Sequence, residues 1–351
     1  MNQDFNMYSK ETRMDEHRKS IRELVNLKKI TSSPLLPQLR KVTQERKCVS
    51  LGELESIPVV YFRDEAILLD RKIESGAYSD IYKAYVILNG EKTKIAVKIL
   101  RNMNSSWSNI KNMSGEKKIL LELPKSPYIV NCLGVVTIIN EQVLSTNNPI
   151  NIAGFVLEYC PYHDLHRVLK EGGINLPVSL LKEWIGHAIM AIHFLHKQEP
   201  PIVHRDIKSS NFLVNKDLVL KLCDFALSRE FTSFNRSTTL ERIRSTLIWA
   251  PPELFLFKIY SLESDIFSLG IVIWEIVYFW THNNKYNLPY NISSIWHMTE
   301  MYSTDQEKRP PIDGIPEKWL HLIRACWAFN IDERVTIEQT LELYNNILKQ
   351  E

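Results

Sequence analysis

Four polar residues between positions 206 and 224 have types and spacings that could carry out acid–base and metal chemistry. The stretch IVHRDIKSSNFLV (202–214) contains the carboxyl group of Asp206, the amine of Lys208 and the amide of Asn211. A second carboxyl group, Asp224, follows in KLCDFALSRE (221–230). A carboxylate can accept a proton from a hydroxyl group, and carboxylate and amide oxygens are the ligands that Mg2+ prefers. These residues could therefore combine a general base with a magnesium site.

The first stretch resembles the catalytic loop of protein kinases, in which His-Arg-Asp is followed, after four further residues, by Asn. The resemblance implies that Asp206 accepts the proton of a substrate hydroxyl and that Asn211 and Asp224 hold Mg2+ beside ATP. Lys208 occupies the position that steadies the transferred phosphate in serine/threonine kinases. His204 is expected to be a packed core histidine rather than an acid or a base.

The strand lysine of a kinase site is also present. IAVKIL (95–100) supplies Lys98 for the α- and β-phosphates of ATP. Its carboxylate partner is expected to be Glu116 on the next helix, with Glu122 as the alternative.

Two further kinase pairings are expected in the second half of the chain. WAPPEL (249–254) resembles Ala-Pro-Glu, and its Glu253 is expected to pair with Arg334. Asp265, in SLESDIFSLG (261–270), is expected to anchor the catalytic-loop backbone from a central buried helix.

The resemblance implies a nucleotide site between two lobes. Its adenine pocket is expected to consist of Ile73, Ile81, Ala96 and Leu213, with Leu157 as gatekeeper and the backbone of Glu158 and Cys160 as the hinge. Its glycine-rich loop, IESGAYSDIYKA (73–84), keeps only Gly76 of three glycines. Glu74 replaces the first, and at about 8 Å and an effective dielectric of about 20 its charge would repel a phosphate by roughly 2 kcal/mol.

The metal-binding motif departs from the kinase pattern at its third position. Asp-Phe-Gly is replaced by Asp-Phe-Ala, so that Ala226 stands where glycine is usual. If the backbone there needs a positive φ in the active state, alanine costs about 1–2 kcal/mol relative to glycine. Cys223, directly before the motif, is expected to be small and buried, although it could react with an electrophile.

The elements around these motifs predict an α+β, two-lobed protein kinase fold. Short β-rich runs separated by turn signals begin near residue 58, and GFVLEY (154–159) adds a strand. After Pro161 the chain is mainly helical, with one apolar face along LLKEWIGHAIMAIHFLH and a buried helix at 267–280. We therefore expect a kinase-like domain at 58–349, with an N-lobe (58–160) and a C-lobe (161–349). An amphipathic helix (8–30) and a linker, together residues 1–57, would form an N-terminal helical extension.

The composition fits a cytoplasmic protein. The chain has 351 residues, of which 44% are hydrophobic and 24% charged, and a formal net charge of +2. This balance favours neither a nucleic-acid surface nor a transmembrane segment. The five cysteines form no CxxC pair, which is typical of a reducing compartment.

Three motifs resemble the mixed lineage kinase domain-like family, within the tyrosine-kinase-like group. They are SSNFLV (209–214), EYC (158–160) and FALSREFTSFNRSTTLERIRST (225–246). The resemblance places Thr232 and Ser233 at paired activation-loop phosphosites, and a phosphate there could recruit Arg205. Members that kill cells carry an N-terminal four-helix bundle, whereas residues 1–57 contain one convincing helix. The precedent for a member without the bundle is the poxviral homologues.

This resemblance leaves two functions open. The first is an ATP-binding pseudokinase with weak or absent phosphotransfer, which engages receptor-interacting kinase 3 and modulates, in the inhibitory direction, necroptotic cell-death signalling. The second is an active serine/threonine kinase that transfers the γ-phosphate of ATP to proteins.

Overall fold

The computed structural model describes most of the chain from residue 61 onward. The described residues are 61–63, 67–75, 79–88, 91–100, 115–139, 150–171, 176–231, 247–291, 294–306 and 308–351. The predicted N-terminal helix (8–30) and linker lie outside them.

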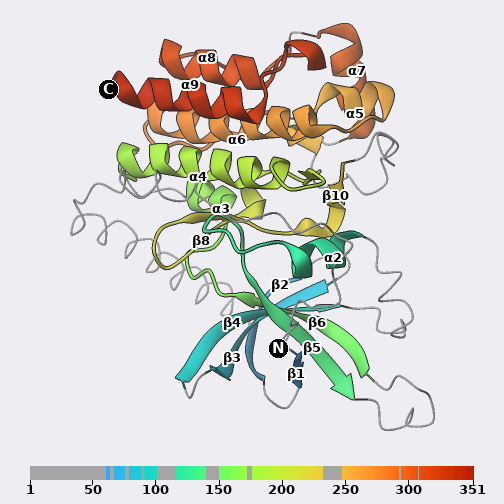
Figure 1. The fold of residues 1–351 in the computed structure, drawn as a ribbon. Coiled ribbons are helices and arrows are strands. Elements are labelled where there is room, and N and C mark those ends of the chain that lie inside the picture. Colours follow the sequence, from blue (N-terminus) through green and yellow to red (C-terminus); the bar gives the residue numbers. More distant parts are fainter. Residues whose placement is uncertain are drawn as a thin grey trace, which may run out of the picture.

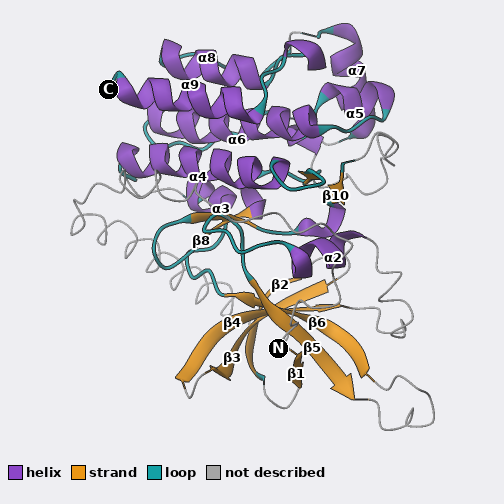
Figure 2. Cartoon of the chain, in the orientation of Figure 1, coloured by secondary structure: helices purple, strands orange, loops and turns teal. Residues whose placement is uncertain are grey.

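The N-terminal part of the described chain forms a six-stranded sheet (Figures 1 and 2). Its strands are β1 (Tyr61–Arg63), β2 (Leu68–Ser75), β3 (Ser79–Leu88), β4 (Glu91–Leu100), β5 (Cys132–Ile139) and β6 (Ile150–Glu158). Their spatial order is β1-β5-β6-β4-β3-β2, and each neighbouring pair is antiparallel except β1–β5. The sequence had indicated most of these strands but not β5.

Side-chain alternation explains why this sheet forms. Every second residue of the central strands is a buried aliphatic group, as Ile95 and Val97 show on β4. They pack with Ala84, Val86, Val136 and Val156 into a small core on one face of the sheet. The opposite face of the sheet carries Ala96 and Lys98, which belong to the predicted nucleotide site.

The second half is mainly helical, as expected (Figure 2). After α2 (Gly115–Glu122), which precedes β5, the helices are α3 (Leu165–Lys170), α4 (Val178–His196), α5 (Pro252–Phe257), α6 (Leu262–Thr281), α7 (Ile295–Thr304), α8 (Glu317–Cys326) and α9 (Ile337–Lys349). Two small antiparallel sheets accompany them: β7 (Ile202–Val203) with β10 (Arg229–Glu230), and β8 (Phe212–Val214) with β9 (Leu220–Leu222). Among the described residues, no helix is both long enough and apolar enough to cross a membrane.

The helical core is built around α4 and α6. The predicted apolar face of α4 is confirmed, because Trp184, Ile185, Ile189 and the other residues of that face are fully buried. The predicted buried helix at 267–280 is the greater part of α6, which packs against α4 on one side and α8 on the other (Figure 1). The predicted α+β arrangement, a strand-rich part followed by a helical part, is thus confirmed, while the proposed domain bounds remain predictions.

Candidate active site

The loop between β7 and β8 (204–211) is anchored by Asp265 on α6. Its Oδ2 accepts a hydrogen bond from the His204 amide (2.7 Å), and its Oδ1 accepts one from the Arg205 amide (3.0 Å). Asp265 is fully buried; burial opposes its ionisation, but hydrogen bonds from His196 and the His204 amide hold its pKa below the ordinary value. The expected anchoring of the catalytic-loop backbone by Asp265 is therefore confirmed.

His204 lies within the loop and links it to the segment after β9. Its Nδ1 accepts a hydrogen bond from the Asp206 amide (3.3 Å), and its Nε2 lies 3.1 Å from the carbonyl oxygen of Cys223. These partners assign the proton to Nε2. Burial lowers the pKa of His204, so the imidazole stays neutral, as a core histidine would.

One hydrogen-bonded cluster within this loop consists of Asp206, Lys208 and Asn211. The Lys208 Nζ lies 2.9 Å from the Asp206 Oδ2, and the Asn211 Nδ2 donates to the same oxygen (2.8 Å) and to the Asp206 carbonyl (2.7 Å). A 3-10 turn over Ser209–Asn211 makes this close approach possible. Because the amide nitrogen of Asn211 donates to Asp206, its oxygen is the atom that could bind a metal.

Lys98 and Asp224 connect the two lobes. The Lys98 Nζ on β4 lies 2.9 Å from the Asp224 Oδ1, which follows β9. Although burial opposes it, the charge and hydrogen bond of Lys98 hold the pKa of Asp224 below its usual range. Glu116 lies in α2, but its side chain is outside the described part of the structure, so its pairing with Lys98 stays a prediction.

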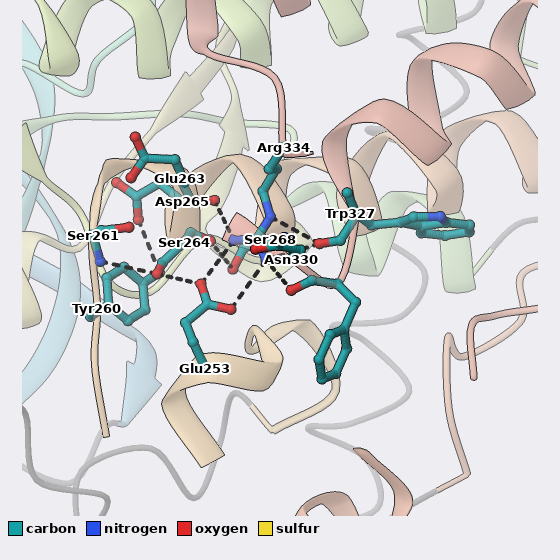
Figure 3. Close-up of polar contacts among 12 residues, drawn as sticks. Glu253, Tyr260, Ser261, Glu263, Ser264, Asp265, Ser268, Trp327, Asn330 and Arg334 are labelled. Carbon is teal, nitrogen blue, oxygen red and sulfur yellow. Dashed lines mark hydrogen bonds and ion pairs between the residues drawn. The ribbon is translucent and has the colours of Figure 1, made fainter. Parts of the chain in front are cut away.

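A third predicted contact lies within the helical part of the chain. Figure 3 shows Glu253 of α5 and Arg334 pointing toward each other. The Arg334 Nη1 and Nη2 donate to the two carboxylate oxygens of Glu253 at 2.8 and 3.1 Å, and both residues are buried. Ser264 also donates to Glu253 (2.6 Å), and Arg334 lies over the Phe267 ring. The predicted Glu253–Arg334 pair is thus confirmed.

Four of the predicted nucleotide-binding residues share one face of the sheet. Ala96 and Lys98 are two residues apart on β4; Ala96 pairs with Leu157 on β6, and Lys98 pairs with Ile81 on β3. Residues opposite each other in a sheet point to the same face, so all four turn away from the aliphatic core. All four are half-buried.

The remaining pocket residues have separate positions. Ile73 is 36% exposed at an irregularity of the edge strand β2, where Lys72 pairs with Tyr82 and Glu74 pairs with Ile81. Leu213 is half-buried on β8 in the C-lobe. Gly76 lies outside the described residues.

Comparison with known proteins identifies this arrangement. Residues 67–343 match the family described as protein tyrosine and serine/threonine kinase. The chain belongs to this family. Since the match is to the family as a whole, the finer resemblance to the mixed lineage kinase domain-like family stays a prediction.

Individual relatives include several kinases of Dictyostelium discoideum. A probable serine/threonine-protein kinase is 31% identical over 312 residues, which cover 84% of this chain and 16% of that protein. Stress-activated protein kinase alpha is 29% identical (79% of this chain, 41% of that protein), and the dual specificity protein kinase shkC is 26% identical (82% and 52%). The chain therefore spans between about one sixth and one half of the length of these relatives.

The predicted hinge contains an ion pair that could not be anticipated from the motifs. The carboxylate of Glu158 binds the Lys221 Nζ of β9 and accepts the Asn131 amide (2.9 Å). The Glu158 amide itself donates to the Asn131 carbonyl (3.0 Å), so a hinge contact to adenine by Glu158 would use its carbonyl. A lysine within the apolar strand LKL was the available signal, because such a residue needs a buried partner.

Two cysteines lie beside residues of the predicted nucleotide site: Cys160 follows the predicted hinge residue Glu158, and Cys223 precedes Asp224. Burial, with the nearby charge of Glu158, raises the pKa of the Cys160 thiol to about 12. Burial also raises the pKa of Cys223 far above its ordinary value. Because the thiolate is the reactive form, the suggestion that Cys223 could react with an electrophile is not supported by its surroundings.

The condition for backbone strain at Ala226 is not met in this structure. Ala226 lies within a 3-10 turn, Phe225–Leu227, and is not among the residues with positive φ. The left-handed conformations fall instead on Asp224 (φ 62°) and Arg205 (φ 69°). Hydrogen bonds and the Lys98 ion pair hold these two residues, so the kinase motif forms without a glycine at 226.

The charge of Glu74 acts on two residues of the helical part of the chain, Asp164 and Cys223. It contributes to raising the pKa of Asp164 and of Cys223, although Glu74 is itself exposed on β2. Its predicted conflict with bound phosphate thus has a physical basis. Thr232 and Ser233, the predicted phosphosites, lie outside the described residues.

Proposed function

We propose that this chain is a serine/threonine protein kinase that transfers the γ-phosphate of ATP to a hydroxyl group of a protein. The observation that carries the proposal is the hydrogen-bonded cluster of Asp206, Lys208 and Asn211 beside the Lys98–Asp224 pair. These are the groups that phosphoryl transfer needs for positioning and charge stabilisation. Because Ala226 does not adopt a positive φ, its replacement of glycine is not an argument against phosphotransfer.

Each residue of the cluster has a distinct proposed role. Asp206 accepts the proton of the substrate hydroxyl. The hydroxyl oxygen forms a bond to the γ-phosphorus, while the bond between that phosphorus and the leaving oxygen of ADP breaks. Lys208 neutralises charge on the transferred phosphate, and Lys98 holds the α- and β-phosphates, with Glu116 as its partner.

The oxygen atoms of Asn211 and Asp224 suit Mg2+, which would neutralise phosphate charge when bound. Among the described residues, no group of three or more His, Cys, Asp or Glu side chains could hold a metal ion. That fits Mg2+, which proteins usually hold through one or two side chains together with phosphate and water.

A phosphotransfer assay tests the proposal. The purified chain is incubated with Mg2+, γ-labelled ATP and a degenerate peptide library, and the labelled amino acids are identified. We expect phosphoserine and phosphothreonine, and a loss of transfer of about 100-fold or more in Asp206→Asn.

Asp217→Asn is the matched control, because it removes one carboxylate from an exposed loop of the same lobe. It should transfer at the wild-type rate. Wild-type transfer no higher than that of Asp206→Asn would refute the kinase proposal.

A second candidate is a partner-binding role in necroptotic signalling, with weak or absent phosphotransfer. It is supported by the sequence of the activation loop (225–246) and by Glu74, whose charge would repel the phosphates of ATP. In this reading the domain engages receptor-interacting kinase 3 and inhibits its signal. Co-purification from cells containing that kinase tests it, and failure to associate where the full-length family effector does would rule it out.

The regulatory residues belong to the same set of proposals. The guanidinium of Arg205 lies over the Tyr260 ring, and burial together with the charge of Arg229 lowers its pKa. Two neighbouring positive charges would attract a phosphate on Thr232 or Ser233. Phosphosite mapping in cells with an active upstream kinase would reveal that modification, and unmodified residues would contradict it.

A cytoplasmic location is also proposed. The cysteines of the described regions, Cys132, Cys160, Cys223 and Cys326, are all free thiols. Free thiols are typical of a reducing compartment. Imaging of a tagged chain would test the location.

A further inference from the structure

Glu275 on α6 is a buried carboxylate that the chemistry above does not use. It is 1% exposed and accepts three hydrogen bonds. Its Oε1 accepts from the Ser209 Oγ (2.9 Å) and the Tyr286 hydroxyl (2.7 Å), and its Oε2 accepts from the Trp249 Nε1 (2.7 Å). A buried carboxylate is costly unless such partners compensate for the lost hydration.

The three donors come from three separate segments. Ser209 follows Lys208 directly in the catalytic loop. Trp249 ends the turn Leu247–Trp249, near the end of the activation segment (225–253) and shortly before Glu253. Tyr286 lies after the end of α6, in a segment that contributes no residue to the proposed active site. One carboxylate therefore joins the catalytic loop to the activation segment.

We propose that Glu275 is a positioning residue that couples the catalytic loop, through Ser209, to the activation segment, through Trp249. The inference rests on the proposed kinase function. In the coupled arrangement Asp206 and Lys208 keep their orientation toward a hydroxyl group that the activation segment presents. Loss of the carboxylate leaves the buried Trp249 N–H and the Ser209 hydroxyl unsatisfied, and the two segments then move independently.

The hydrogen-bonding capacity of each donor decides which substitutions preserve the coupling. The Trp249 indole can only donate, whereas the hydroxyls of Ser209 and Tyr286 can donate or accept. A glutamine at 275 can therefore accept from Trp249 with its oxygen and donate its amide hydrogens to the hydroxyls. A methionine has similar length but offers only a weak acceptor.

The surroundings of Glu275 include other titratable groups. The Tyr286 hydroxyl also lies 3.0 Å from the His166 Nδ1, and the charge of Asp164 acts on Glu275. Burial, countered in part by the three hydrogen bonds, raises the pKa of Glu275 to about 7. An uncharged glutamine removes this titration while keeping the contacts.

The first experiment compares Glu275→Met with Glu275→Gln. For Glu275→Met we expect kcat to fall about tenfold or more, the effect of about 1.4 kcal/mol, while KM for ATP changes less than about twofold. Glu275→Gln should keep kcat within about threefold of the wild type, since about 0.7 kcal/mol or less separates them. Equal loss in both variants, or an equal rise in KM for ATP, would overturn the proposal.

The second experiment removes one donor at a time. Ser209→Ala, Trp249→Phe and Tyr286→Phe each delete one hydrogen bond to Glu275. The coupling predicts lower kcat for the first two only, whereas a merely structural role predicts similar loss in all three. Neither Ser209→Ala nor Trp249→Phe should lower kcat further in a Glu275→Met background, and additive losses there would reject the coupling.

A readout independent of turnover separates this inference from the kinase proposal. If the wild-type chain transfers no phosphate, the proposed function fails, and amide hydrogen exchange decides the coupling. Trp249→Phe should then speed exchange at residues 205–211 in the presence of Glu275 but not in a Glu275→Met background. Equal acceleration in both backgrounds would overturn the coupling.

Discussion

The Lys98 amine and the Asp224 carboxylate meet at 2.9 Å, across the boundary between the six-stranded sheet and the helical part of the molecule. The pair brings together a phosphate-binding candidate from β4 and a metal-binding candidate that follows β9. In the proposed site, Lys98 would bind phosphate and Asp224 would bind Mg2+, so both functions depend on the position of this pair.

Lys98→Met should diminish nucleotide binding. MgATP is expected to raise the melting temperature of the wild-type domain by mass action, and the shift should be largely lost in the variant. Lys94→Met, an exposed lysine on the same strand, is the control and should keep the full shift. Equal shifts in Lys98→Met and the wild type would exclude this site.

Ala226→Gly should bring no gain in turnover. Ala226 does not have the positive φ that favours glycine, so we expect turnover within about twofold of the wild type and a loss of up to about 1 kcal/mol in the free energy of unfolding. Steady-state kinetics and denaturant unfolding measure both. A tenfold increase would mean that the active state places residue 226 at positive φ after all.

Glu253→Gln should strongly destabilise the domain. It leaves the buried guanidinium of Arg334 without a countercharge, and breaking such a pair costs about 3–5 kcal/mol. Glu338→Gln, which breaks the exposed pair with Lys197, should cost about 1 kcal/mol or less. Similar costs in the two variants, by urea unfolding, would contradict the assigned burial of Arg334.

Glu275 should make the stability of the domain depend on pH. Its folded-state pKa of about 7 lies above its usual 4.5, so the folded state binds the proton more tightly than the unfolded state does. This contribution to stability is present at low pH and lost as the pH rises through 7. From pH 5 to pH 8 the wild type should lose about 2–3 kcal/mol relative to Glu275→Gln. Parallel pH profiles of the two proteins would refute the raised pKa.

The fold and the core of the site could be predicted because their signals are local in sequence. The apolar face of α4 repeats with the helical period, and Asp206, Lys208 and Asn211 lie within six residues of one another. The Lys221–Glu158 and Glu275–Ser209 contacts join residues more than sixty positions apart. No spacing rule encodes such pairs, since only the folded chain brings them together.

The error at Ala226 has a different cause. The sequence rule that links glycine to positive φ is a statement about one residue, whereas tertiary contacts decide which residue adopts that conformation. Here Asp224 adopts it, with its carboxylate held by Lys98. The positive φ therefore occurs two residues before the position at which the kinase pattern has glycine.

Asp265 binds the catalytic loop through the amides of His204 and Arg205, which are groups that every amino acid except proline supplies. The shape of the loop is thus independent of the reactive side chains that it displays. A lineage could exchange Asp206 for an inert residue and keep the scaffold intact, whereas a change at Asp265 would remove the scaffold while every reactive group remained. A mutation at Asp206 and a mutation at Asp265 would therefore have different consequences: the first removes catalysis and keeps the loop structure, and the second removes the loop structure itself.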